Sequence, residues 1–249
     1  MVTPLRETGF SQSRQRSARG TVRIAETFIS RQGEGKLTGT KSFFIRTSGC
    51  NLRCWFCDTP YASWHPEGHD FSIDELIQMA ARSGVKHVVL TGGEPMLPSQ
   101  VTALTQQLGL DSFHVTIETA GTINREVHCD LMSISPKFRS SAPNAEEHPT
   151  WNRTHEKRRL SIRAIHELIE QSADFQLKFV VDSDEDYAEL LEIVDAVGCE
   201  GCHVLIMPQG STNAALDDAK KWLEPWCVDH GFQYCDRMQI RWYGNRRGT

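Results

Sequence analysis

The sequence lacks several features that would set it apart from ordinary globular proteins. It has no apolar run long enough to cross a membrane, and its first residues contain no segment fit for a signal peptide. Positive charge is not in excess, since 27 Lys and Arg residues stand against 32 Asp and Glu residues, so no global field attracts nucleic acid. No internal repeat is visible. We therefore expect a cytoplasmic protein with neither a membrane partner nor a nucleic-acid partner.

Cysteine is not scarce, but one cysteine group lacks a fourth member. The chain has eight cysteines, which a reducing compartment keeps as thiols for metal binding or chemistry rather than for disulfides. Three of them, Cys50, Cys54 and Cys57, lie within the stretch SGCNLRCWFCDT. A closed zinc site needs four ligands and disulfides need pairs. Three neighbouring thiols therefore leave one ligand position to be explained.

The composition changes once along the chain. Residues 1–20 are polar, Arg-rich and aperiodic, which predicts a disordered tail rather than a basic arm on nucleic acid. Residues 21–249 are expected to form a single domain with a polar, charged insertion near residues 139–160.

Apolar β runs alternate with helical patterns along this domain. Strands are predicted at residues 42–47, 86–91, 114–119, 131–135, 175–181, 203–208 and, more briefly, 232–236. Helices are predicted at residues 71–84, 98–109, 161–172, 184–198 and 212–231. This alternation favours a parallel α/β sheet with right-handed crossovers. The pattern alone leaves open whether the sheet is doubly wound or forms a complete or partial barrel.

Glycine, proline and polar residues gather directly after the predicted strands. The cysteine loop follows the first strand, and later strands are followed by TGGEP (91–95), ETAGT (118–122), SPK (135–137) and PQGS (208–211). Parallel strands open their carboxyl ends onto one face, and that face carries the active site in α/β folds. Any one of these segments is ordinary turn chemistry, but five together indicate a site.

The spacing C-x₃-C-x₂-C suits thiolates that hold one [4Fe–4S] cluster. With three protein ligands, one iron keeps an open position, which the amino and carboxylate groups of S-adenosylmethionine (SAM) can fill. The competing interpretation is a structural zinc site completed by His65 or His69, but zinc does not account for TGGEP. Cys199 and Cys202 form a second C-x₂-C with no other pair nearby, and packed or surface thiols are expected there.

The motifs together resemble a known family. The three cysteines, with Phe56 before the last, resemble the signature of the radical SAM superfamily, and residues 92–95 resemble its GGEP segment. With RQGEGKLTG (31–39), the FFIR strand, CDT, ETAGT and SPK in order, the chain from about residue 25 resembles the 7-carboxy-7-deazaguanine synthases. This resemblance implies a radical SAM core: a partial TIM-like βα barrel of about six parallel strands with a reduced helix set.

The resemblance also implies an activity. Members of this family convert 6-carboxy-5,6,7,8-tetrahydropterin to 7-carboxy-7-deazaguanine with loss of ammonia, on the route to queuosine-type 7-deazapurines. A radical derived from SAM removes a hydrogen atom from C6 and later returns it. The implied cofactors are a [4Fe–4S] cluster, SAM and Mg²⁺. The implied partners are the pterin substrate, a reductant such as flavodoxin or ferredoxin, and a second copy in a homodimer.

Individual roles follow from the resemblance. Cluster ligands are expected at Cys50, Cys54 and Cys57, and a magnesium ligand at Thr59. Substrate contacts are expected from Arg31, Gln32, Gly33, Arg46 and Thr91. Cofactor contacts are expected from Phe56, Cys57, Asp58, Gly93, Glu94, Ser135, Pro136, Lys137, Met207, Pro208, Gln209 and Gly210. The C-terminal GNRRGT is expected near the substrate.

Some of these roles have plainer alternatives. Arg46 could instead form an ion pair with Glu34 or Glu94. Asp58 and Thr59 could merely cap a turn, and Lys137 could form a surface salt bridge.

Two other functions stay open at this point. A glycyl-radical-enzyme activase shares the cysteine loop and GGEP-like features, but it must admit a protein loop, whereas the QGEG segment favours a small planar substrate. A non-enzymatic module would use the cysteines for a structural metal and the Arg-rich tail to bind RNA.

Overall fold

A single nine-stranded sheet forms the centre of the computed structural model, which describes residues 20–249. The predicted tail at residues 1–20 lies outside the described residues except for Gly20. The strand order is β3-β1-β2-β4-β5-β6-β7-β8-β9. The strands are β1 (Thr21–Arg31), β2 (Lys41–Thr47), β3 (His69–Ser72), β4 (His87–Gly92), β5 (His114–Thr119), β6 (Leu131–Ile134), β7 (Asp174–Val181), β8 (Val204–Pro208) and β9 (Gln233–Tyr234).

The strand order decides between the two architectures that the sequence left open. β1 runs antiparallel to β2 and β3, whereas every pairing from β2 through β4 to β9 is parallel. These parallel strands follow chain order without the reversal that defines a doubly wound sheet. Stepwise winding in one direction is typical of a βα barrel. Because β3 and β9 are the two ends of the sheet, the barrel is partial, and this prediction is confirmed.

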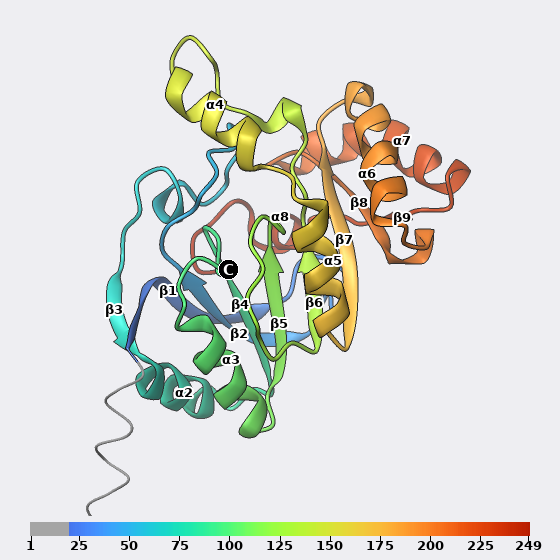
Figure 1. Cartoon of the computed structure of the whole chain (residues 1–249). Helices are drawn as coiled ribbons and strands as arrows, with labels where there is room; N and C mark the ends of the chain where they lie inside the picture. The colour runs from blue at the N-terminus through green and yellow to red at the C-terminus, as the bar shows by residue number, and fades with distance from the viewer. Residues whose placement is uncertain (1–19) are drawn as a thin grey trace, which may run out of the picture.

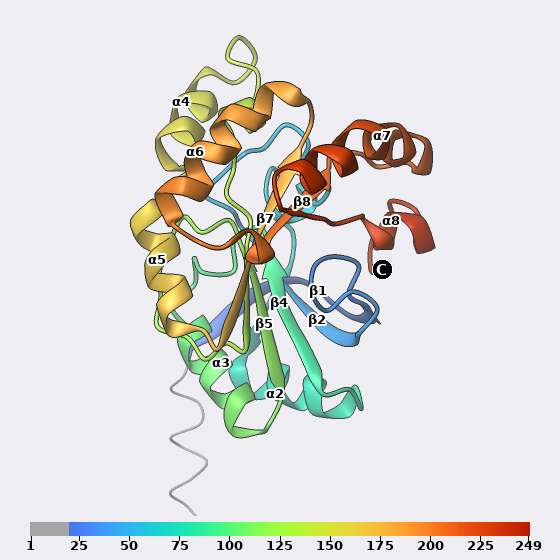
Figure 2. The same ribbon diagram turned by 90° about the vertical axis from the view of Figure 1, so that its right-hand side faces the viewer.

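Helices cover one face of the sheet. They are α2 (Ile73–Arg82), α3 (Val101–Leu110), α5 (Ile162–Gln171), α6 (Tyr187–Val197) and α7 (Asn213–Asp229). Figure 2 shows α5 and α6 on one side of the sheet, with α8 (Met238–Tyr243) and the C-terminus on the other. The helix set is reduced as expected, since the loop after β2 forms only a short 3₁₀ turn, Pro60–Ala62, before β3. None of the helices formed by residues 20–249 is long and apolar enough to cross a membrane.

The predicted helix boundaries have clear local causes. Ser72 caps α2 through a capping box, because its hydroxyl accepts the Glu75 N–H while the Glu75 carboxylate accepts the Ser72 N–H. Gly84, with φ of +70°, follows the end of the helix in the left-handed conformation.

Side chains alternate between the two faces of the parallel strands. The outward side chains pack with the helices into the hydrophobic core and include Ile45, Leu90, Ile117, Ile134 and Phe179. The inward side chains are largely polar and include Arg46, Thr91, Glu118, Ser133 and Lys178. A polar inner face is unusual for a buried parallel sheet, and it marks the side on which ligands bind.

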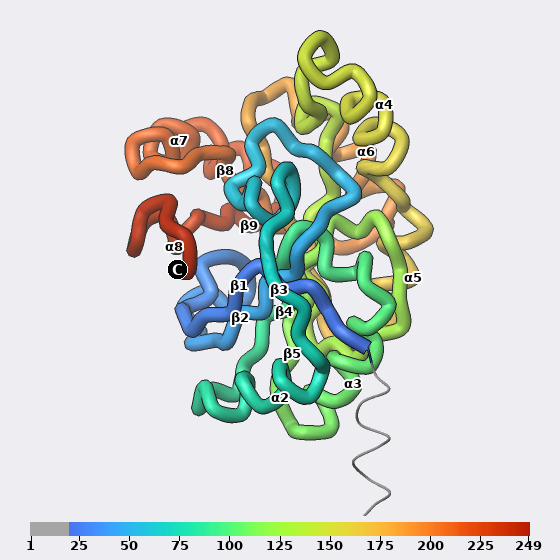
Figure 3. The backbone as a smooth tube through the Cα atoms, turned by 90° about the vertical axis from the view of Figure 1, so that its left-hand side faces the viewer, coloured from blue at the N-terminus to red at the C-terminus, as the bar shows by residue number. Residues whose placement is uncertain are grey.

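The structure adds elements that the sequence did not predict. β1 and β3 extend the sheet with antiparallel strands, so Arg31 ends a strand rather than lying before the first one. The polar insertion contains a 3₁₀ turn, Arg139–Ser141, and a helix, α4 (Pro149–Arg158). Figure 1 shows α4 above the open edge of the sheet, and Figure 3 shows it beside the loop that follows β2.

We predict that Leu104→Ala destabilises the protein by about 2–5 kcal/mol, because Leu104 of α3 is fully buried and its truncation leaves a cavity. Leu110→Ala is the matched control at the end of the same helix, where the side chain is 79% exposed, and it should change stability by less than about 0.5 kcal/mol. Urea unfolding followed by circular dichroism measures both. Equal effects would contradict the assigned helix faces.

Candidate active site

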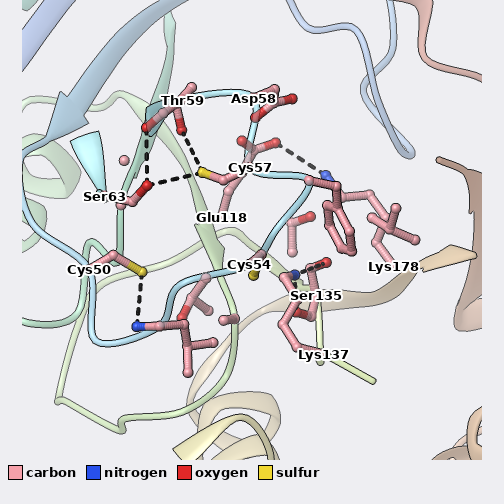
Figure 4. Close-up of a pocket in the computed structure, with 18 of the residues that line it drawn as sticks. Cys50, Cys54, Cys57, Asp58, Thr59, Ser63, Glu118, Ser135, Lys137 and Lys178 are labelled. Atoms are coloured by element: carbon pink, nitrogen blue, oxygen red, sulfur yellow. Dashed lines mark hydrogen bonds and ion pairs between the residues drawn. The ribbon is translucent and has the colours of Figure 1, made fainter. Parts of the chain in front are cut away.

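The three clustered cysteines lie on the loop that leaves the carboxyl end of β2. All three are free thiols that line one cavity, with Ser135 and Lys137 beside Cys54 (Figure 4). The Leu52 N–H donates to Cys50 Sγ at 3.4 Å, and Ser63 Oγ lies 3.1 Å from Cys57 Sγ. The loop thus presents its thiols to one cavity and holds them with its own polar groups.

Burial controls the protonation of these thiols. Burial, reinforced by Glu94, raises the pKa of Cys50 to about 12, and burial raises the pKa of Cys54 to about 11. Both thiols therefore keep their protons at neutral pH until a metal displaces them.

The geometry disfavours the zinc interpretation. Within residues 20–249, no group of three or more His, Cys, Asp or Glu side chains converges to hold a single metal ion. His65 and His69 are both exposed, and His69 belongs to β3, paired with Ile24 of β1. Three thiols that line one cavity without a fourth protein ligand suit a [4Fe–4S] cluster that keeps one iron open.

The TGGEP turn packs directly against the cysteine loop. The Gly93 N–H donates to Thr47 O and the Glu94 N–H to Gly49 O at 2.9 Å. A Cβ on Gly93 would overlap the backbone oxygens of Gly49 and Ala62, so only glycine allows the two backbones to approach this closely.

The Glu94 side chain joins two strand ends. It is fully buried, and its carboxylate accepts hydrogen bonds from Thr119 Oγ1 at 2.7 Å and from the N–H groups of Met96 and Ala120 at 3.0 Å each. Burial raises its pKa despite these bonds. Glu94 thus fixes the β4 turn to the β5 turn and is not among the residues that line the cavity.

The remaining predicted cofactor residues divide into two groups. Those that line the thiol cavity are Phe56, Cys57, Asp58, Gly93, Ser135, Lys137 and Met207. Those that, like Glu94, are not among its lining are Pro136, Pro208, Gln209 and Gly210. Lys137 does not form the surface salt bridge considered above: its ammonium donates to Ser135 O at 2.6 Å and Ser135 Oγ at 2.7 Å, and burial lowers its pKa.

A second cavity of about 430 Å³ adjoins the first, a size within the range of small-molecule sites. Every predicted substrate residue lines it, namely Arg31, Gln32, Gly33, Arg46 and Thr91. Thr59, the predicted magnesium ligand, lines both cavities. Thr59 precedes the Pro60–Ala62 turn without a side-chain cap hydrogen bond, so the capping alternative is not observed. Its hydroxyl oxygen lies 3.8 Å from Cys57 Sγ instead.

Arg46 has an ion-pair partner that the sequence did not suggest. Glu26 lies opposite Arg46 in the β1–β2 pair and accepts a hydrogen bond from Arg46 Nε at 2.8 Å. The ion-pair partner is therefore Glu26, not Glu34 or Glu94. The same Glu26 oxygen accepts the Tyr61 hydroxyl at 2.7 Å. The two Nη groups of Arg46 make no hydrogen bond within the described chain, so they remain free to bind an anion in the cavity.

A buried charge network joins the two cavities and was missed in the sequence. The Lys178 ammonium donates to Glu34 and lies 3.6 Å from Glu118. Arg237 donates to Asp58 and to Gly210 O, and its Nε lies 3.6 Å from Glu34. Burial opposes ionisation of Glu34, but the adjacent Lys178 and Arg237 lower its pKa to about 2. Asp58, beside Cys57, is thereby tied to a residue far along the chain.

The C-terminal segment lies against the second cavity, as the resemblance implied. Residues 244–249 form part of its wall. Arg247 donates to Glu26 at 3.2 Å and to Glu67 at 2.8 Å, and its guanidinium lies 3.9 Å from the centre of the Tyr61 ring. The chain end is therefore fastened to β1 and to the loop before β3.

Comparison with known proteins places this site in a class. Residues 44–194 match the Radical SAM superfamily, so the chain belongs to that superfamily. The crystal structure of QueE from Escherichia coli has the same fold, with a TM-score of 0.65 at 22% identity, covering 92% of this chain and 99% of that chain.

The curated relatives define the family more closely. The 7-carboxy-7-deazaguanine synthase of Rhodopirellula baltica is 52% identical over 100% of this chain and 96% of its own length. That of Halobacterium salinarum is 40% identical over 95% of this chain and 96% of its own length. The chain belongs to the 7-carboxy-7-deazaguanine synthase family.

Superfamily membership implies a [4Fe–4S] cluster and SAM, and the residues present fit these groups. Three unpaired thiols line one cavity, and the close approach at Gly93 leaves its backbone on the same wall. Cys50, Cys54 and Cys57 would hold the cluster and leave one iron open to SAM.

We predict that Arg237→Gln lowers the free energy of unfolding by about 3 kcal/mol or more, because it leaves the buried Glu34 carboxylate with one cation fewer. Lys221→Gln breaks the exposed ion pair with Asp218 and should cost about 0–1 kcal/mol. Urea unfolding of the metal-free proteins measures the difference. An effect of Arg237→Gln no larger than that of Lys221→Gln would refute the buried network.

Proposed function

We propose that this protein converts 6-carboxy-5,6,7,8-tetrahydropterin to 7-carboxy-7-deazaguanine with loss of ammonia. The observation that carries the proposal is the shared wall between the two cavities. Glu34, Asp58, Thr59, Gly92 and Glu118 line both of them. A cofactor on the thiol side and a small molecule on the other side are thus held in contact.

The second cavity offers groups that match each part of a carboxypterin. The Nη groups of Arg46 suit the substrate carboxylate, because a guanidinium binds carboxylates through two parallel hydrogen bonds. Phe28 and Phe44 are stacked with ring centres 4.8 Å apart and line the same cavity, so they offer an apolar surface to a flat ring. Glu118 is 22% exposed and accepts only one hydrogen bond in the described chain, from Gln32 at 3.1 Å. It can therefore accept N–H donors of the pterin.

When bound, the cluster and SAM supply a carbon radical that removes a hydrogen atom from the substrate and returns it. The chain's own residues hold the reactants in place. Cys50, Cys54 and Cys57 present thiols to one side of the shared wall, and Arg46 orients the substrate from the other side. Lys178 pairs with Glu34 and approaches Glu118, and together with Arg237 it lowers the pKa of the buried Glu34 carboxyl.

Magnesium is assigned to the boundary between the cavities. Thr59 lines both cavities, and Mg²⁺ takes few protein ligands because it keeps several waters and binds substrate oxygens. A cation at this place would face the substrate carboxylate. This position supports a role for Mg²⁺ in orienting the substrate.

The proposal extends to partners and location. A one-electron donor such as flavodoxin or ferredoxin, and a homodimer, rest on the family alone. A cytoplasmic location suits the eight free cysteines, because thiols persist in a reducing compartment.

The activase alternative is less well supported. A protein loop needs a wide entrance, whereas the substrate cavity is walled by the C-terminal segment and Arg247. The RNA-binding alternative depends on residues 1–20, nearly all of which lie outside the described residues, and on a single structural metal, which the thiol geometry disfavours.

We predict that the anaerobically reconstituted, reduced protein forms 7-carboxy-7-deazaguanine from the carboxytetrahydropterin, SAM and Mg²⁺, as detected by mass spectrometry. Cys54→Ala should abolish the product because it removes a cluster ligand. If the wild-type protein cleaves SAM but yields no deazapurine, and a partner protein gains a glycyl radical instead, the activase assignment replaces this one.

We predict that Thr59→Val raises the Mg²⁺ concentration needed for half-maximal turnover by roughly 10–100-fold, the size of effect found when metal-site partners are removed. Val keeps the shape of Thr but lacks the oxygen. Thr59→Ser keeps the hydroxyl and should behave like the wild type. Product formation measured against MgCl₂ concentration tests the pair, and superimposable curves for Val and Ser would remove Thr59 from the magnesium site.

A further inference from the structure

The polar insertion packs against the cysteine loop rather than standing away from it. The Trp55 N–H donates to Ser141 O at 3.1 Å, and the Trp55 indole N–H donates to Ser140 O at 2.9 Å. Both bonds join the segment between Cys54 and Cys57 to the 3₁₀ turn that precedes α4. The insertion is therefore in direct contact with the backbone that carries the cluster ligands.

His155 of α4 makes the most buried of these contacts. Its side chain is fully buried, and its Nδ1 accepts the Arg53 N–H at 3.2 Å. Nε2 lies 2.9 Å from Ser141 Oγ, and Ser141 Oγ donates to Phe138 O at 2.6 Å. Because Nδ1 accepts and the Ser141 proton is already used, Nε2 must carry the imidazole proton. Burial, with Lys137 and Arg159 nearby, lowers the pKa of His155 to about 4, so this neutral form persists at physiological pH.

Arg53 is the other member of the contact. It lies between Cys50 and Cys54 and is only 8% exposed. Its Nη1 donates to Cys50 O at 2.8 Å and Leu52 O at 2.7 Å, so the side chain closes the turn on itself. Its guanidinium lies 3.9 Å from the centre of the Trp151 ring of α4. Among residues 20–249 no carboxylate pairs with it, so the ring and the two carbonyls hold it in place.

The same face of α4 also reaches the far side of the thiol cavity. Arg159 is the C-cap residue directly after α4, four residues beyond His155, and is 4% exposed. It donates to Lys137 O at 2.9 Å and pairs with Glu189 of α6 at 2.6 Å. Lys137 follows β6, whereas the cysteine loop follows β2. One short helix thus connects two walls of the cavity.

We propose that α4 is a clamp that fixes the turn between Cys50 and Cys54, with His155 as its positioning residue. In this role the imidazole Nδ1 holds the Arg53 N–H, and so the three thiols keep the one arrangement that retains the cluster and orients SAM. The inference rests on the proposed function only in requiring that the thiols bind a cluster. His155 itself contacts neither cluster nor substrate.

Two substitutions of His155 separate the loss of its hydrogen bond to Arg53 from the general effect of replacing a buried imidazole. In His155→Asn the side-chain amide reaches the place of Nδ1 and still offers an acceptor to the Arg53 N–H. In His155→Gln the amide reaches the place of Nε2 and keeps the Ser141 contact but not the Arg53 contact. Both variants bury a neutral amide, so any loss of stability from replacing the imidazole itself should be similar in the two.

The measurements are made on reconstituted holoenzyme. We expect His155→Gln to release its iron to a chelator about 10–100-fold faster than wild type, and to change the electron paramagnetic resonance spectrum of the reduced cluster with SAM bound. His155→Asn should stay close to wild type in both properties. Arg153→Ala, an exposed change on the same helix, should match wild type.

Three outcomes overturn the clamp: Gln and Asn variants with equal iron release, a spectrum unchanged in the Gln variant, or Arg153→Ala as impaired as His155→Gln. Should either variant fail to fold, amide hydrogen exchange at residues 50–57 in full-length metal-free Trp151→Leu, compared with wild type, gives the same test. Faster exchange there supports the clamp, and unchanged exchange refutes it. A wild-type protein that binds no cluster would instead refute the proposed function, so the two failures are distinguishable.

Discussion

Parallel pairing in chain order is the constraint on which the rest of the structure depends. Because β2 and β4 to β8 all point the same way and lie side by side, their carboxyl ends meet along one open edge. The cysteine loop, the glycine turn and the SPK segment are separated in sequence but become neighbours there. The period-2 alternation of the strands then divides the side chains, so that helices cover the apolar face and the inner face is left to polar groups.

Those inner polar groups stabilise one another only as a set. Glu34 is ionised in a buried place because Lys178 and Arg237 lie beside it. Lys178 also forms an ion pair with Glu118. Arg237 extends the set to Asp58 on the cysteine loop. Loss of Lys178 or Arg237 leaves the buried Glu34 carboxylate with one cation fewer, which costs more than an exposed ion pair contributes. The network therefore links Arg237, near the C-terminus, to the position of the cysteine loop.

Much of this arrangement could be predicted from the sequence, and the exceptions have physical reasons. Strands with continuous apolar runs and helices with capping signals were predicted near their observed positions, because local periodicity determines them. β1 was missed because its exposed and buried residues mix charge with apolar side chains, and it lies in the sheet only through antiparallel pairing with β2. Arg237 and Glu26 were missed because their roles depend on partners distant in sequence, for which no local motif exists. α4 was missed because its composition is polar, although His155 on it and Arg159 directly after it are buried.

The wall shared by the two cavities has a thermodynamic consequence. Any occupant of one side forms part of the surface that an occupant of the other side meets, so the two binding equilibria are linked. Linkage is reciprocal: whatever factor the pterin contributes to the affinity for SAM, SAM must return to the affinity for the pterin. Mutual tightening of this kind would favour the ternary complex over either binary one, and would keep a reactive radical from forming where no hydrogen donor is in place.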